Sequence, residues 1–315
     1  MKQFPAARAV ARTCFPPAAL LLMVLAALPR PLAAQDLPSA ATPRGLVFAF
    51  LTETASHLDS VNRTAFRNRL VGEMAHTDPK SFKGLVPAGT RLRIDSIPNL
   101  RPLPDGTRRA LAYVTVDISG ERENWSVFCR GDSIWRIEAL RRFPNPMQRA
   151  QIKQSLRTLD TTTYAYRTLR SELAHSLCSD DSLRSLFRRG RTDASRLVDL
   201  LRRGNHWSSI ALNEVDFGKL EEYRELDDDI EPSQLIFYTL DRKLLQGLEQ
   251  QLGPVSIERD SRNPDLVYLV MGTLEKQTFG FLNAPDPTKL PELSPDGFIV
   301  LKPVDKGWWL YKRMR

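Results

Sequence analysis

Hydrophobic and polar residues recur with two different spacings along the chain, and the spacing changes from helical to extended twice. Residues 43–59 carry apolar side chains at helical spacing, and Thr42-Pro43 supplies an N-cap residue followed by proline at the first helical position. A second helical spacing covers residues 66–78 and ends at Pro79. The pattern therefore predicts two helices before the first strand.

Strand-like alternation follows, and turn-forming residues divide it into four predicted strands, at 91–94, 110–118, 125–130 and 133–140. Val114 and Val116 lie on one apolar face of the second of these strands. Tyr113 and Asp117 share its opposite face, which we expect to point toward solvent. A register shift of one residue would exchange the two faces.

The helical spacing then returns. Asn145-Pro146 again places a capping residue before proline, which predicts a helix start. Residues 146–204 form a compact helical segment in this interpretation. Gly190 and Gly204 follow apolar helical stretches, at positions where a helix needs a left-handed residue to end, so we expect two short helices there.

A longer amphipathic helix is predicted from Pro232 to Gly253. Strands are predicted after it at 255–257, 266–270, 277–282, 298–301 and 308–311. A proline-rich loop at 284–297 separates two of these strands, and loops of that length are more often functional than routine connections. Trp308 and Trp309 point to opposite faces of the last strand, so one of them is expected to be exposed beside this loop.

These elements predict an α+β protein with two helix-plus-sheet domains. The predicted segments are a helix-plus-curved-antiparallel-sheet domain at 43–141, a helical segment at 146–204 and a second helix-plus-antiparallel-sheet domain at 205–315. The boundary is expected within residues 142–146, where two prolines mark the change from strand to helix. A fragment that ends near Phe143 should then fold alone.

The leading helix, the curved strands and the closing hairpin, Trp125-x-Val-Phe followed by Gly131-Asp-x-x-Trp135-Arg-Ile137, resemble the cystatin-like, nuclear-transport-factor-like α+β superfamily. The resemblance covers residues 43–141. In that family a long helix lies across the concave face of a curved sheet and often encloses a pocket. The resemblance implies such a pocket here, and the family includes small isomerases and hydrolases as well as binding proteins.

The apolar faces of the predicted strands indicate which side chains would line such a pocket. Their residues are Val114, Val116 and Ile118, then Trp125, Val127 and Cys129, then Trp135, Ile137 and Ala139. None of these residues is an acid or a histidine, which favours a packed core or an apolar ligand over acid–base catalysis. Trp125 and Trp135 either fill the core, which is the simpler interpretation, or contact a ligand.

The first 34 residues are typical of a signal peptide. Lys2, Arg8 and Arg12 precede an 11-residue apolar run at 18–28, and small residues favour cleavage after Ala34. The alternative is an uncleaved anchor, but the run is too short to span a bilayer. We therefore expect an exported protein, periplasmic or extracellular, that is not an integral membrane protein.

Composition and charge argue against a nucleic-acid partner. The 315 residues are 42% hydrophobic and 26% charged, as in an ordinary soluble protein. Four of the eight net positive charges lie in residues 1–34, which leaves +8 − 4 = +4 for the remainder. Residues 184–203 hold seven Arg and two Asp, and residues 214–231 hold nine acids and two basic residues, so the two tracts can neutralise each other.

Motifs for nucleotide binding, zinc binding or serine hydrolase chemistry are absent from the sequence. Glu73-x-x-His76 and Glu172-x-x-His175 match half of a di-iron site, but the partner glutamates of such a site are not evident. We therefore expect no catalytic residue, no metal and no cofactor. Cys129 and Cys178 are expected to stay unpaired, with Cys129 buried as a small hydrophobe.

The sequence thus predicts an exported, non-enzymatic binding or scaffolding protein of the cell envelope or extracellular space. Its candidate ligand-binding residues are Trp125, Trp135, Trp308 and Trp309. The expected partner is an envelope protein, a glycan or a small apolar ligand. The alternative is a small hydrolase or isomerase that uses the concave pocket of the first domain.

Overall fold

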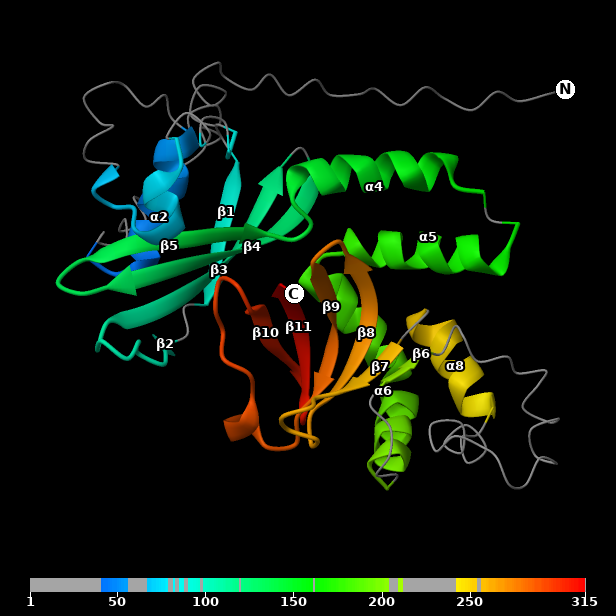
Figure 1. The fold of residues 1–315 in the computed structure, drawn as a ribbon. Coiled ribbons are helices and arrows are strands. Elements are labelled where there is room, and N and C mark those ends of the chain that lie inside the picture. The colour runs from blue at the N-terminus through cyan, green and yellow to red at the C-terminus, as the bar shows by residue number, and fades with distance from the viewer. Residues whose placement is uncertain are drawn as a thin grey trace, which may run out of the picture. The chain divides into compact units, whose positions relative to one another are not determined.

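The computed structural model describes residues 41–55, 67–78, 82, 85–87, 90–96, 99–118, 120–160, 162–203, 209–211, 242–253 and 256–314. The predicted signal peptide, the acidic tract, Gly204 and parts of the predicted helices at 43–59, 66–78 and 232–253 lie outside these residues. The described residues belong to one compact unit, and the architecture is α+β, as predicted (Figure 1).

The first sheet is antiparallel and contains all four strands predicted for this region. Its strands are β1 (Arg91–Ser96), β2 (Asn99–Leu100), β3 (Arg108–Ile118), β4 (Glu121–Gly131) and β5 (Trp135–Arg142). They lie in the order β1–β3–β4–β5, and the short β2 also pairs with β3. We refer to this sheet as sheet A.

Helix α2 (Pro43–Ala55) begins at the predicted proline, and the Thr42 hydroxyl accepts a hydrogen bond from the Gly45 amide at 3.1 Å. Among the described residues of the second predicted helix, Arg67 is helical and Gly72–His76 form a short 3₁₀ helix, η1. Between them Leu70 forms a β-bridge with Ile137 of β5, which interrupts the predicted helix.

Helix α2 covers one face of sheet A. Its buried residues pack with η1, Phe82 and Val86 against the apolar strand face that the alternation predicted. The strand residues of this cluster are Ala110, Ala112, Val114, Val116, Trp125, Val127, Cys129 and Ile137. Apolar side chains thus fill the face on which the resemblance implied a pocket.

The two cysteines among the described residues, Cys129 and Cys178, are free thiols, and Cys129 is fully buried under α2, as predicted for a small hydrophobe. Burial raises the pKa of the Cys129 thiol to about 12, so it is protonated at neutral pH. Cys178 is partly buried on the far side of sheet A, in the larger hydrophobic cluster.

The opposite face of sheet A is buried as well, and the expectation that Tyr113 points toward solvent is wrong. Tyr113 is 4% exposed and packs, with Leu111 and Phe128, against the second half of the chain. A strand that is covered on both faces carries no hydrophobic contrast from which its orientation can be predicted. Asp117, near the end of β3, keeps a partly exposed side chain.

A β-bulge in β5 corrects a second expectation about this sheet. Phe128 pairs with Ala139 while the next residue, Cys129, pairs with Ile137, which leaves Glu138 as an extra residue. The extra residue shifts the alternation, so Ala139 packs beside Phe128 and Ile137 packs under α2. Simple alternation had placed both residues on one face.

Four described helices follow sheet A: α4 (Pro146–Thr158), α5 (Tyr164–Ser176), α6 (Asp180–Arg203) and α8 (Arg242–Leu252). The predicted start of α4 is confirmed by a capping box. Asn145 Oδ1 accepts a hydrogen bond from the Gln148 amide at 2.9 Å, and Gln148 Oε1 accepts one from the Asn145 amide at 3.0 Å. None of the described helices has the length and apolar character needed to cross a bilayer.

The expectation that Gly190 ends a helix is wrong, because Gly190 lies inside α6, a single helix of 24 residues. A Cβ atom at position 190 would lie 2.7 Å from Leu252 of α8, so the glycine allows these two helices to approach closely. Gly253, in contrast, ends α8 with a φ of +83°, as predicted for a helix terminator.

The second sheet, sheet B, is also antiparallel. Its strands are β6 (Ser209–Ala211), β7 (Ser256–Arg259), β8 (Val267–Leu274), β9 (Gln277–Asn283), β10 (Phe298–Asp305) and β11 (Trp308–Met314), in the order β10–β11–β9–β8–β7–β6. Side chains of sheet B, α6 and α8 pack in one hydrophobic cluster with Leu111, Tyr113 and Phe128 of sheet A. The predicted boundary at 142–146 therefore lies inside a continuous core.

Candidate functional site

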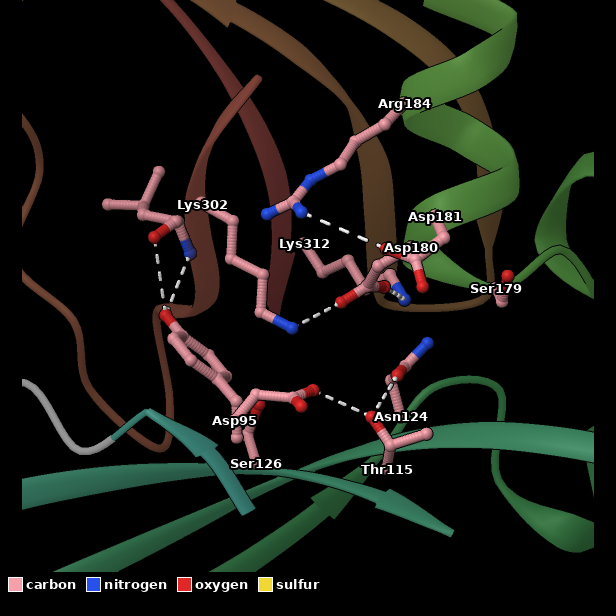
Figure 2. Close-up of polar contacts among 12 residues, drawn as sticks. Asp95, Thr115, Asn124, Ser126, Ser179, Asp180, Asp181, Arg184, Lys302 and Lys312 are labelled. Atoms are coloured by element: carbon pink, nitrogen blue, oxygen red, sulfur yellow. Dashed lines mark hydrogen bonds and ion pairs between the residues drawn. The ribbon is translucent and has the colours of Figure 1, made fainter. Parts of the chain in front are cut away.

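A cavity of about 620 Å³ lies where sheet A meets the start of α6 and the edge of sheet B. Its remaining wall comes from the proline-rich loop, which contains the 3₁₀ helix η5 (Pro287–Lys289). Pockets for small molecules commonly have volumes of about 300–1,000 Å³. Figure 2 shows the polar residues on both sides of this cavity.

Sheet A contributes a polar wall. Asp95 of β1 and Asn124 of β4 line the cavity, and the hydroxyl of Thr115 on β3 lies between them. Thr115 Oγ1 donates a hydrogen bond to Asp95 Oδ2 at 2.7 Å and lies 3.2 Å from Asn124 Oδ1. Arg93 also forms an ion pair with Asp95, so this carboxylate has two polar partners.

A buried group of three charged residues forms the opposite wall. Asp180 is the first residue of α6, and it binds Lys302 Nζ at 2.6 Å and Lys312 Nζ at 2.7 Å (Figure 2). The side chains of Asp180 and Lys312 are 4% and 2% exposed, and that of Lys302 is 11% exposed. We call these residues the Asp180 triad. Asp180 and Lys302 line the cavity.

The charges of the Asp180 triad do not cancel. Burial raises the pKa of Asp180, but the ammonium groups of Lys312 and Lys302 outweigh it, and the pKa falls well below its ordinary value. The carboxylate is therefore ionised at neutral pH. One negative charge faces two positive charges, which leaves a net positive charge in a buried position beside the cavity.

Tyr113 connects sheet A to β10 through its hydroxyl group. The hydroxyl accepts a hydrogen bond from the Leu301 amide at 3.1 Å and lies 3.3 Å from the Leu301 carbonyl oxygen, to which it donates. Ser126 Oγ donates to the Ile299 carbonyl at 2.7 Å in the same region. Burial raises the pKa of Tyr113, so this residue holds the two sheets together as a neutral phenol.

The loop and β11 form the less polar part of the lining. Leu290, Pro291 and Leu293 of the loop and Trp309 of β11 line the cavity there. The Trp309 indole nitrogen is buried and has no hydrogen-bond partner among the described residues. Trp309 lines the cavity together with residues of the proline-rich loop, but it is partly buried and not exposed as expected.

The other three predicted ligand-binding residues do not line this cavity. Trp125 is buried under α2, where its indole nitrogen donates to Glu123 at 2.8 Å. Trp308 is buried in the core, and its indole nitrogen donates to Ser195 Oγ at 3.1 Å. Trp135 is partly buried at the start of β5, with the Arg108 guanidinium 5.0 Å from its ring.

The Asp180 triad was not predicted, because its members are far apart in the chain. Asp180 is 122 residues from Lys302 and 132 residues from Lys312. One local signal was available: Lys312 lies in phase with Trp308 and Leu310, which are core residues of β11. A lysine on the apolar face of a strand requires a buried acidic partner.

The described residues contain no group of three or more His, Cys, Asp or Glu side chains placed to hold a metal ion. Residues of the two Glu-x-x-His motifs have other contacts. Glu73 accepts hydrogen bonds from both terminal nitrogens of Arg141, one of them at 2.9 Å. His175 lies against Gly253, and burial lowers the pKa of its imidazole.

No family model, curated protein or solved structure matches this chain. The resemblance of residues 43–141 to the cystatin-like superfamily therefore stays a prediction. The chemistry of the cavity is inferred from its own residues.

Proposed function

We propose that the protein is an exported, non-enzymatic binding protein that holds a small organic molecule in the cavity between sheet A and sheet B. The observation that carries this proposal is the mixed lining of a cavity of about 620 Å³. Leu290, Leu293 and Trp309 offer apolar surface, while Asn124 and Lys302 offer polar groups. Ligand pockets combine a largely apolar wall with a few placed polar groups in this way.

Fixed contacts of the polar residues favour binding over catalysis. Asp180 is held as a carboxylate by two lysines, and the Tyr113 hydroxyl is occupied by the backbone of Leu301. Asp95 is engaged by Thr115 and Arg93. A general base must take up a proton and a nucleophile must approach the substrate, whereas these groups are held by contacts within the protein.

The alternative of a small hydrolase or isomerase required a pocket on the concave face of the first sheet. That face is packed by Leu46, Val47, Phe50 and Leu51 of α2. The proposed ligand site is instead on the opposite face of sheet A. The proposal of export rests on residues 1–34 and on their resemblance to a signal peptide.

Titration of the purified protein with the neutral dye N-phenyl-1-naphthylamine, followed by fluorescence, tests the proposal. We expect saturable binding with one dye per chain. Asn99 lines the cavity and is exposed, so Asn99→Trp should weaken binding about tenfold by occupying the space without disturbing the core. Ser133→Trp, at an exposed turn outside the lining, is the matched control and should bind like the wild type.

Dye binding that does not saturate, or that is equal in wild type and Asn99→Trp, would contradict the proposal. A broad screen for esterase, isomerase and glycosidase activity should stay at background. Reproducible turnover lost on a single substitution in the cavity lining would replace the binding proposal with an enzymatic one.

A further inference from the structure

We infer that the molecule bound in this cavity is an organic anion whose oxyanion group, a carboxylate, phosphate or sulfonate, contacts Lys302 and Arg184. The inference rests on the proposed function, because it names the class of ligand for the same cavity. Two independent observations support it: the charge balance of the lining and the hydrogen-bond donors in it.

The charge balance leaves one positive charge at the cavity. Asp180 can neutralise only one of its two lysines, and Lys302 is the lysine that lines the cavity. Its ammonium group also lies 4.4 Å from the centre of the Tyr113 ring, a weaker contact than an ion pair. An anionic group beside Lys302 would complete the neutralisation that Asp180 begins.

The other acidic residues of the lining already have cationic partners. Asp95 pairs with Arg93, and Asp181 lies 3.8 Å from Arg184. Glu292 is 53% exposed and lies 3.9 Å from Arg109, which also pairs with Glu138. Each of these acidic residues thus has a cationic neighbour other than Lys302. An incoming anion meets a local surplus of positive charge there.

The hydrogen-bond donors of the lining point to the same class of ligand. Arg184 lines the cavity with a side chain that is 31% exposed, and its terminal guanidinium nitrogens are donors that cannot accept a hydrogen bond. A ligand group that binds these nitrogens must therefore present acceptor atoms. Arg184 reaches from α6 toward the side on which Lys302 leaves β10 (Figure 2).

The apolar part of the cavity indicates that the anion has an organic body. An inorganic ion has no apolar part to contact Leu290, Leu293 and Trp309. These side chains offer an apolar surface for the rings or short chains of an organic ligand. The expected ligand is therefore amphipathic, with an oxyanion at the Lys302 end. This narrows the predicted small apolar ligand to one that carries a negative charge.

Two dyes with the same aromatic skeleton test the inference. 8-Anilinonaphthalene-1-sulfonate carries a sulfonate group, and N-phenyl-1-naphthylamine does not. We expect the wild type to bind the sulfonate about tenfold more tightly, since hydrogen bonds to charged groups contribute about 1.5–3 kcal/mol each. The two dyes should compete for one site.

Lys302→Met and Arg184→Gln should each remove most of this preference, lowering sulfonate affinity about tenfold while changing affinity for the neutral dye less than about twofold. Lys302→Met leaves the ion pair between Asp180 and Lys312 intact. Arg188→Gln removes the same charge one turn further along α6, at an exposed position outside the lining, and should leave both affinities unchanged. Lys302→Arg keeps the charge and should retain the preference.

Thermal unfolding of each variant, followed by circular dichroism, shows which variants are folded. If Lys302→Met does not fold, the dye affinities of Arg184→Gln test the inference. Saturable binding of the neutral dye without a preference for the sulfonate would overturn the inference and leave the proposed function standing. Equal weakening of both dyes by Lys302→Met or Arg184→Gln would also overturn it. Absence of saturable binding for either dye would overturn the proposed function and the inference together.

Discussion

Asp180 shows how one side chain determines the cost of burying two others. Its carboxylate lies 2.6 Å from Lys302 Nζ and 2.7 Å from Lys312 Nζ, in a position almost closed to water. A buried ion pair contributes little net stability when it is complete, but the loss of one partner leaves an uncompensated charge. The effect of a substitution in the Asp180 triad therefore depends strongly on which member is changed.

Asp180→Asn should lower the free energy of unfolding by about 3–5 kcal/mol, because it leaves two buried ammonium groups without a counter-ion. Lys302→Met should change it by less than about 1 kcal/mol, because the pair of Asp180 and Lys312 remains. Urea denaturation of the two variants and the wild type measures the difference. Equal losses for both variants would show that the charge balance of the triad is unimportant for stability.

The stabilising effect of Asp180 should depend on pH. Its folded-state pKa lies below the value of about 3.9 for an unfolded aspartate, so the unfolded chain binds more protons between these two values. The contribution is fully present above about pH 5 and is lost as the pH falls below about 4 toward the lowered pKa. Urea midpoints between pH 3 and pH 7 should show the wild-type advantage over Asp180→Asn narrowing at acid pH, and a constant difference would contradict this account.

At the scale of elements, the features that could be predicted are those that depend on residues adjacent in the sequence. The starts of α2 and α4 follow from a capping residue before proline, and the strands of sheet A follow from alternation. The orientation of Tyr113 and the continuity of α6 through Gly190 could not be predicted. Both depend on what packs against the element, β10 in one case and α8 in the other.

Of the candidate site, only the part formed by Trp309 and the proline-rich loop could be predicted from the sequence. Trp309 and the proline-rich loop are separated by a single strand, so their proximity follows from local order along the chain. The Asp180 triad joins α6 to the last two strands of sheet B, and no sequence spacing relates its members. The cavity beside it therefore becomes visible only in the folded chain.

The contact between α6 and α8 at Gly190 gives a prediction for these two helices. Gly190→Ala should destabilise the protein by about 1–3 kcal/mol, because the added methyl group overlaps Leu252. This cost appears although alanine is the better helix former by about 1 kcal/mol. Gly247→Ala in α8 is the matched control, since its methyl group would meet only the ends of two polar side chains, those of Asp193 and Gln251.

Urea unfolding measures both variants, and Leu252→Ala tests the cause. The penalty of Gly190→Ala should shrink in the Leu252→Ala background, because the overlapping atoms are removed. An undiminished penalty would mean that the methyl group at 190 acts through other contacts.

At the scale of the whole molecule, the shared core changes the expectation for a fragment that ends near Phe143. Such a fragment would keep the face under α2 but expose Leu111, Tyr113 and Phe128, which the second half covers. We expect it to aggregate or to unfold without a cooperative transition. Sedimentation and a urea titration of residues 41–143 test this, and a soluble fragment with a cooperative transition would restore the predicted domain boundary.

The hydrogen bond of Tyr113 to Leu301 has a consequence for the order of events during synthesis. The two residues are 188 positions apart, so this contact cannot form until β10 has left the ribosome. At about 5–20 residues per second, that delay is roughly 10–40 s. For this interval the apolar residues on the face of sheet A opposite α2, Leu111, Tyr113 and Phe128, lack the part of their cover that β10 supplies. Hydrophobic surface that is incompletely buried during folding makes a chain prone to aggregation and a substrate for chaperones.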